Sequence, residues 1–124
     1  MGSNQFLVDL NNAKSLALKV IEGPNIGDTF VHTTVKGKAN IGRKATNEIS
    51  FPEDQHLSNM HSTIFAIEGI WYIEDLGTTN GYYSSYKRTW VRLSPEGHKS
   101  PRHPLENGTQ FKLGSNLTFE CQLN

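Results

Sequence analysis

Apolar and polar side chains alternate at every second position in the strongest segments of this chain. Residues 117–123 show the clearest alternation, and residues 16–21, 63–67 and 71–74 repeat it. A period of two is typical of β-strands with one buried face, because successive side chains of a strand point to opposite sides of the sheet. Shorter runs of the same kind predict further strands at 29–31, 39–41, 48–51 and 89–93.

Turn-forming residues separate these runs. Clusters rich in glycine, asparagine and proline occur at 22–25, 80–81, 106–108 and 114–116, and such clusters favour tight connections between neighbouring strands. No stretch has a good helical period. Short strands joined by turns predict an all-β fold, an antiparallel β-sandwich or barrel.

Residues 82–105 break this regularity. The stretch carries five basic side chains and three prolines against one acid, Glu96. Its composition predicts a long basic loop that encloses a short strand at 89–93. By contrast, residues 48–75 contain six acids and no lysine or arginine, so the neutral total charge hides an uneven distribution.

Length and composition narrow the class of protein. A chain of 124 residues can form one domain with its own core. We expect residues 15–124 to form that domain, after a tail at 1–14 that begins with Met-Gly-Ser, a sequence typical of a cloning scar. Lys+Arg and Asp+Glu both number 12, so net charge points to no nucleic-acid or membrane partner. The single cysteine, Cys121, and the lack of a membrane-spanning apolar run favour an intracellular module. We expect the isolated domain to be a monomer, although the sequence does not determine its oligomeric state.

Three short polar segments follow or separate the predicted strands. They are Gly42-Arg43, Ser58-Asn59-Met60-His61 and Asp75-Leu76-Gly77-Thr78-Thr79-Asn80-Gly81. Arginine presents a rigid fork of donors that suits phosphate, and hydroxyl and amide groups add further donors. Each segment alone also has a plainer interpretation, as a surface ion pair or a self-contained turn. Together they favour holding an oxyanion rather than transforming it.

Catalytic and metal-binding interpretations find less support. Ser58 and His61 have a spacing that a serine hydrolase could use with an acid such as Asp75, but the chain has no Gly-x-Ser-x-Gly elbow. A bracing role is favoured instead, in which His61 binds loop backbone and Ser58 donates outward. His56 and His61 with Asp54 form a poor metal set, and one cysteine cannot build a structural zinc site. We therefore expect no enzyme activity, no metal and no cofactor.

The order and spacing of the three segments resemble the forkhead-associated (FHA) domain. That family has Gly-Arg, then Ser-x-x-His about 15 residues on, then Asp-Leu-Gly-Ser/Thr-x-Asn-Gly after two further strands, as this chain does. The resemblance covers residues 15–123, nearly the whole chain. It implies an eleven-stranded β-sandwich whose loops at one end bind phosphothreonine peptides and so mediate phosphorylation-dependent protein–protein interaction in signalling.

The resemblance also implies which residues bind the ligand. The phosphopeptide site would consist of Arg43, Ser58, Asn59, Thr79 and Asn80, and the structural residues that shape its loops would be Gly42, His61 and Gly81. Arg43 would pair with the phosphate or with the peptide backbone near it. Ser58 and Thr79 would contact the phosphate, and Asn80 would hold the main chain of the ligand. Asn59 stands where the family often has arginine or lysine, which implies a less positive site than usual.

Other functions stay open at this point. A phosphate-independent interaction or structural module could use a sheet face or the 82–105 loop. That loop could contact acidic partner residues or a second phosphate, or it could be a solvated insertion. Nucleic-acid binding through its basic and aromatic residues is a more distant alternative.

Overall fold

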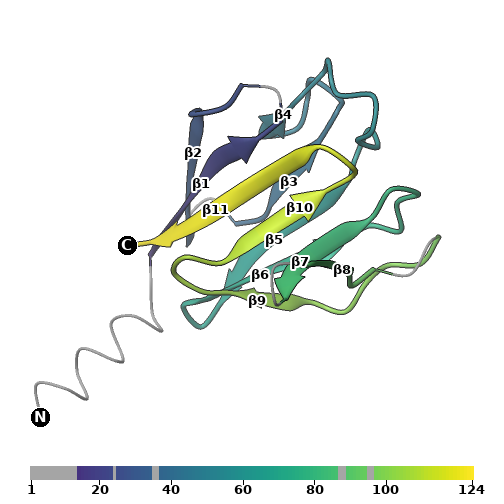
Figure 1. Ribbon diagram of the computed structural model, residues 1–124. Helices are drawn as coiled ribbons and strands as arrows, with labels where there is room; N and C mark the ends of the chain where they lie inside the picture. Colours follow the sequence, from purple (N-terminus) through teal and green to yellow (C-terminus); the bar gives the residue numbers. More distant parts are fainter. Residues whose placement is uncertain (1–13, 24, 35–36, 87–88, 95–96) are drawn as a thin grey trace, which may run out of the picture.

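Two β-sheets pack face to face in this protein (Figure 1). The computed structural model describes residues 14–23, 25–34, 37–86, 89–94 and 97–124. The predicted tail therefore lies outside the described residues except at Lys14, and so do Lys87, Arg88 and Glu96 of the basic stretch. No α-helix occurs in the described part, and hence none of a length and apolarity that could cross a bilayer.

The larger sheet, at the front in Figure 1, has the strand order β2-β1-β11-β10-β7-β8. Its strands are β1 (Ser15–Glu22), β2 (Thr29–Thr33), β7 (Tyr82–Tyr86), β8 (Thr89–Arg92), β10 (Gln110–Leu113) and β11 (Leu117–Leu123). The smaller sheet has the order β4-β3-β5-β6-β9. Its strands are β3 (Ala39–Gly42), β4 (Ile49–Ser50), β5 (Ser62–Ile67), β6 (Ile70–Asp75) and β9 (His103–Leu105). The paired strands are antiparallel except β3 and β4, which are parallel. The predicted all-β sandwich is confirmed.

The alternating apolar positions meet between the two sheets. The larger sheet contributes Leu16, Leu18, Leu117 and Phe119, and the smaller sheet contributes Ile41, Ile64, Trp71 and Ile73, all 1% exposed or less. Burying each such side chain contributes about 1.5–3 kcal/mol to folding. Cys121 belongs to the same core, where burial raises the pKa of its thiol to about 12.

The prediction of one long loop at 82–105 is wrong. Within the described residues of this stretch lie three strands, β7, β8 and β9. Strands β7 and β8 form a hairpin in which Tyr83 pairs with Arg92, and β7 also pairs with β10. Strand β9 tolerates Pro104 because it lies at the edge of its sheet, where a missing N–H costs little. Only the strand expected at 89–93 was recognised, and it is β8.

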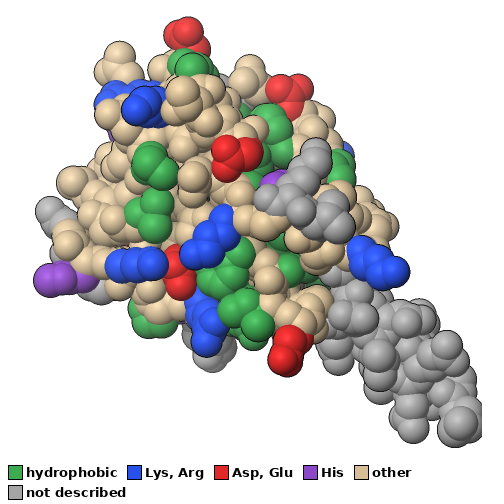
Figure 2. All heavy atoms as spheres, turned by 180° about the vertical axis from the view of Figure 1, so that it is seen from behind, with side chains coloured by type: hydrophobic (Ala, Val, Ile, Leu, Met, Phe, Trp, Pro, Cys, Tyr) green, Lys and Arg blue, Asp and Glu red, His purple; other side chains and the backbone are tan. Residues whose placement is uncertain are grey.

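Basic and apolar side chains share the outer face of the smaller sheet. Figure 2, the view from behind, shows lysine and arginine side chains lying among hydrophobic ones on this face. Phe65 and Tyr72 stack with their ring centroids 5.9 Å apart. Lys38 lies over the ring of Phe65, and Arg102 lies over the ring of Tyr72. The long basic side chains thus cover aromatic surface that would otherwise face water.

Strand direction brings the three polar segments to one end of the sandwich. Strand β5 is antiparallel to both β3 and β6, so β3 and β6 run in the same direction. The C-terminal ends of β3 and β6 therefore lie at the same end of the sheet as the N-terminal end of β5. The loops 43–48, 51–61 and 76–81 gather there.

Candidate functional site

Backbone hydrogen bonds fix the first loop against the second. The N–H of Arg43 donates to the carbonyl of Ser58 (3.0 Å), and the N–H of Lys44 donates to that of Asn59 (3.2 Å). The buried amide of Asn47 donates to the carbonyls of both Lys44 (2.8 Å) and Asn59 (2.7 Å). Arg43 and Ser58 are therefore held side by side by main-chain geometry rather than by their own side chains.

Gly42 permits this close approach. A Cβ at position 42 would collide with the carbonyl oxygen of Asn59, and it would lie 2.9 Å from the amide nitrogen of Asn47. Because the first of these atoms is backbone, a side chain could not move it aside cheaply. The Gly-Arg pair thus combines the residue that lets the two loops touch with the residue that presents a guanidinium beside them.

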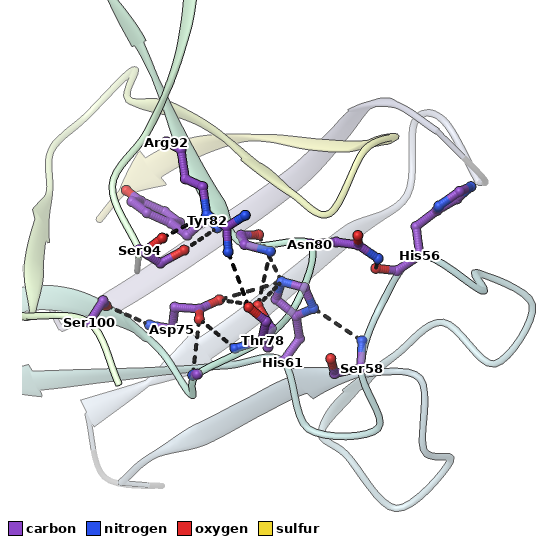
Figure 3. A network of polar contacts seen from close by, with 12 residues as sticks. His56, Ser58, His61, Asp75, Thr78, Asn80, Tyr82, Arg92, Ser94 and Ser100 are labelled. Atoms are coloured by element: carbon purple, nitrogen blue, oxygen red, sulfur yellow. Dashed lines mark hydrogen bonds and ion pairs between the residues drawn. The ribbon is translucent and has the colours of Figure 1, made fainter. Parts of the chain in front are cut away.

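His61 connects the second loop to the third. Its backbone N–H donates to the carbonyl of Ile41 (2.8 Å). Its Nδ1 accepts the backbone N–H of Ser58 (3.1 Å), so the ring proton must lie on Nε2, which donates to the carbonyl of Gly81 (2.8 Å) (Figure 3). The ring is completely buried. The neutral imidazole therefore acts as a brace between two loops.

The pKa of His61 predicts how the brace responds to acid. Burial lowers this pKa below its ordinary value of 6.5, although the Gly81 carbonyl and Asp75 act in the opposite direction. The unfolded chain then binds more protons than the native state as pH falls through 6.5. We expect the free energy of unfolding to decrease over that range, because a protonated Nδ1 could no longer accept from Ser58.

NMR titration of the His61 ring, with urea unfolding between about pH 7.5 and 5.5, tests this prediction above the range where most carboxylates titrate. Burial also lowers the pKa of His103, so the titration is repeated in a His103→Gln variant. A His61 that titrates at or above 6.5 would contradict the prediction.

Asp75 organises the third loop from inside. Its carboxylate is 0% exposed. Oδ2 accepts the backbone N–H groups of Gly77 (3.0 Å) and Thr78 (2.9 Å), and Oδ1 accepts the hydroxyl of Thr78 (2.7 Å). The Thr78 oxygen in turn accepts the N–H of Gly81 (3.0 Å). Oδ1 also lies 3.5 Å from Nε2 of His61. The carboxylate thus fixes the turn from 77 to 81.

Arg92 supports the same loop from strand β8. Its Nε donates to the carbonyl of Ser94 (2.7 Å) and its Nη2 to the carbonyl of Thr78 (3.2 Å). A Cβ at Gly81 would lie 2.7 Å from Nε of Arg92, and Gly81 has a φ of +80°, so a side chain there would be both crowded and strained. Sequence reasoning counted Arg92 only as one charge of a basic loop and missed this contact.

The predicted binding residues surround this braced interior. Arg43 and Ser58 are half-buried, while Asn59, Thr79 and Asn80 are exposed. Nη2 of Arg43 donates to Oδ1 of Asn59 (3.4 Å), and Asn80 donates to the carbonyl of His56 (3.0 Å). Contacts therefore join Arg43, Ser58 and Asn59 directly. Asn80 contacts the loop that carries Ser58 through its hydrogen bond to the His56 carbonyl. Thr79, the residue before Asn80, is exposed.

Donor groups lie on the exposed side of this arrangement, and the described residues of the site include no paired nucleophile and base. The imidazole of His61 accepts the backbone N–H of Ser58, and both of its ring nitrogens are already hydrogen-bonded. It is therefore not placed to take a proton from the Ser58 hydroxyl. Among the described residues, no group of three or more His, Cys, Asp or Glu side chains is placed to hold a metal ion. The site offers a guanidinium, hydroxyl groups and amides, which is chemistry suited to binding an anion.

A β-sandwich whose loops at one end carry a guanidinium, hydroxyl groups and amides is the class of protein that the fold and the site define. The family model of the FHA domain matches residues 39–114, well over half of the chain. The protein therefore belongs to the FHA domain family.

Known proteins resemble the chain in sequence and in structure. The probable E3 ubiquitin-protein ligase dma1 of Schizosaccharomyces pombe is 33% identical over 68 residues, which span 55% of this chain and 24% of that relative. An FHA domain of a hypothetical protein from Arabidopsis thaliana superimposes with a TM-score of 0.74 at 29% identity, covering 90% of this chain and 86% of that one. A structure from a structural and functional analysis of phosphothreonine-dependent FHA domain interactions superimposes with a TM-score of 0.66 at 21% identity. The match covers 89% of this chain and 97% of that one. At that identity the last likeness concerns the fold alone.

Proposed function

We propose that this domain binds phosphothreonine-containing segments of partner proteins and carries out no chemistry on them. One observation carries the proposal: a buried network braces three loops so that Arg43, Ser58, Asn59 and Asn80 meet at one end of the sandwich. Such donors, held in place before the ligand arrives, suit a phosphate, which has close to two charges near pH 7 and several acceptor oxygens.

Each residue has a role in this proposal. Arg43 pairs with the phosphate through its fork of donors, and the hydroxyl of Ser58 donates to a second phosphate oxygen. Thr79 donates through its hydroxyl or its backbone N–H, and Asn80 holds the main chain of the peptide. Asn59 contributes an uncharged amide, and the exposed Lys44 beside Arg43 adds positive charge to the rim.

Membership in the FHA domain family supports the same function. One structural neighbour is described by its phosphothreonine-dependent interactions, and another is an FHA domain complexed with the intracellular domain of a partner. The chain aligns with only 24% of the yeast ligase, so the ligase chemistry in that name is not carried over.

The proposal also includes the boundaries of the module and its location in the cell. Residues 15–124 act as the unit, since Ser15 and Asn124 exchange backbone hydrogen bonds at adjacent ends of β1 and β11. The isolated unit is a monomer that works inside the cell, where kinases supply phosphothreonine and Cys121 stays a reduced core thiol.

A phosphothreonine peptide library tests the function. We expect the domain to select phosphorylated peptides and inorganic phosphate to compete with them. Phosphoserine counterparts should bind a few-fold more weakly, because one buried methyl group contributes about 0.8 kcal/mol. Equal retention of the phosphorylated and unphosphorylated libraries would show that the domain is a phosphate-independent module instead.

A further inference from the structure

An acidic hollow adjoins the proposed phosphopeptide site. It has a volume of about 340 Å³, and its lining residues are Glu53, Asp54, Gln55, His56 and Asn116. The amide of Asn80 donates to the carbonyl of His56 (3.0 Å), and Ser58 follows His56 by two positions (Figure 3). The hollow and the proposed site therefore share a wall.

The carboxylate of Asp54, beside this wall, has only one of its two oxygens hydrogen-bonded to the described residues. The residue is only 5% exposed. Its Oδ1 accepts the backbone N–H of His56 (2.9 Å), whereas its buried Oδ2 has no hydrogen-bond partner among the described residues. A buried carboxylate oxygen without a partner is unfavourable, and a positive charge held in the adjoining hollow would reduce that penalty through electrostatic attraction.

The other lining groups suit the same kind of ligand. Glu53 is exposed and adds a second carboxylate, and the side-chain amides of Gln55 and Asn116 bring further acceptor oxygens. The lining contains no lysine or arginine. In the described part of the chain, neither Glu53 nor Asp54 forms an ion pair. One loop at this end of the fold thus carries the positive charge of Arg43 and Lys44, and another carries the negative charge of the hollow.

We propose that this hollow selects phosphothreonine peptides that carry an arginine or lysine at the position reaching Glu53 and Asp54. The inference rests on the proposed function and deepens it. A peptide with a phosphate and a basic side chain matches both charges of this surface. A peptide with an acid at that position meets like charge instead, which costs affinity.

A series of alanine-flanked phosphothreonine peptides tests the inference, with arginine, glutamate or alanine placed at each flanking position in turn. We expect arginine at one position to raise affinity about three- to tenfold over alanine, the range for a partly exposed charge-assisted pair. Glutamate there should lower affinity. Titration calorimetry measures both effects.

Three variants assign the preference to the hollow. Glu53→Gln changes an exposed side chain, and Asp54→Asn keeps an oxygen to accept from His56. Both should reduce the arginine preference while leaving the affinity of the all-alanine phosphopeptide unchanged. Glu106→Gln removes an equal charge from an exposed position after β9, towards the opposite end of the sandwich, and should leave the preference intact.

The outcomes separate this inference from the proposed function. Equal affinity for arginine and alanine peptides at every position, with phosphate-dependent binding retained, overturns the inference alone. An arginine preference that survives unchanged in both the Glu53→Gln and the Asp54→Asn variants overturns it as well. If no phosphopeptide of the series or of the library binds, the inference and the proposed function fall together.

Discussion

Replacing Arg43 with alanine is expected to weaken phosphothreonine-peptide binding by a factor of a hundred or more. A hydrogen bond to a charged group contributes about 1.5–3 kcal/mol, and a guanidinium can make two such bonds to one phosphate. Losing about 3 kcal/mol corresponds to roughly a hundredfold in the dissociation constant. The variant also removes positive charge from a site in which Asn59 is already neutral.

The same substitution should leave stability almost unchanged. The side chain of Arg43 is half-buried, and the hydrogen bond found for it is that to Asn59 at 3.4 Å. Its backbone N–H, which ties the first two loops together, remains in the alanine variant. We expect the free energy of unfolding to change by no more than about 0.5 kcal/mol, as for most surface substitutions.

Titration calorimetry on the folded variant measures the loss, and denaturant unfolding measures the stability. Lys44→Ala is the matched control, because it removes one positive charge from the adjacent exposed position. It should weaken binding far less than Arg43→Ala, since a lysine at the rim acts as a screened point charge. Intact affinity in a folded Arg43→Ala protein would contradict the proposed site.

Alternation along the chain was enough to predict most of the fold. Residues 117–123 have one buried face and no proline, and they form β11 where expected. Strand β7 (Tyr82–Tyr86) was not predicted because its sequence lacks a clear alternation of apolar and polar residues. Strand β9 was not predicted because its partner, β6, is distant in sequence. Judged from the sequence alone, Pro104 is unfavourable for a strand, yet it pairs with Tyr72 as part of an edge strand. Local propensity carries no information about such pairing.

Some residues of the candidate site could likewise be predicted from the sequence, and others could not. Arg43, Ser58 and Asn80 could be predicted because their segments have a recognisable order and spacing. The interior that holds them could not, since it depends on contacts through space. Gly81 must avoid the guanidinium of Arg92, which comes from a strand predicted only inside a loop. Asp75 was considered as a catalytic acid, whereas its oxygens bind backbone and Thr78 instead.

Replacing Asp75 with alanine is expected to lower the free energy of unfolding by about 3 kcal/mol or more. The substitution leaves the N–H groups of Gly77 and Thr78 and the hydroxyl of Thr78 without their acceptor in a buried or partly buried setting. Each buried donor left unsatisfied costs about 1–3 kcal/mol. This loss is a large share of the 5–15 kcal/mol typical of a domain.

Urea unfolding measures this loss, and two further variants define its cause. Asp75→Asn keeps one acceptor oxygen, so it should be less destabilised than Asp75→Ala. Asp28→Ala removes an exposed aspartate for which no side-chain hydrogen bond is found among the described residues, and it should stay within about 0.5 kcal/mol of the parent protein. An Asp75→Ala protein as stable as the Asp28→Ala control would show that the carboxylate does not organise the loop. If the network does hold the loop, Asp75→Ala should also weaken phosphopeptide binding under conditions where it remains folded, because Thr79 and Asn80 lose the turn that positions them.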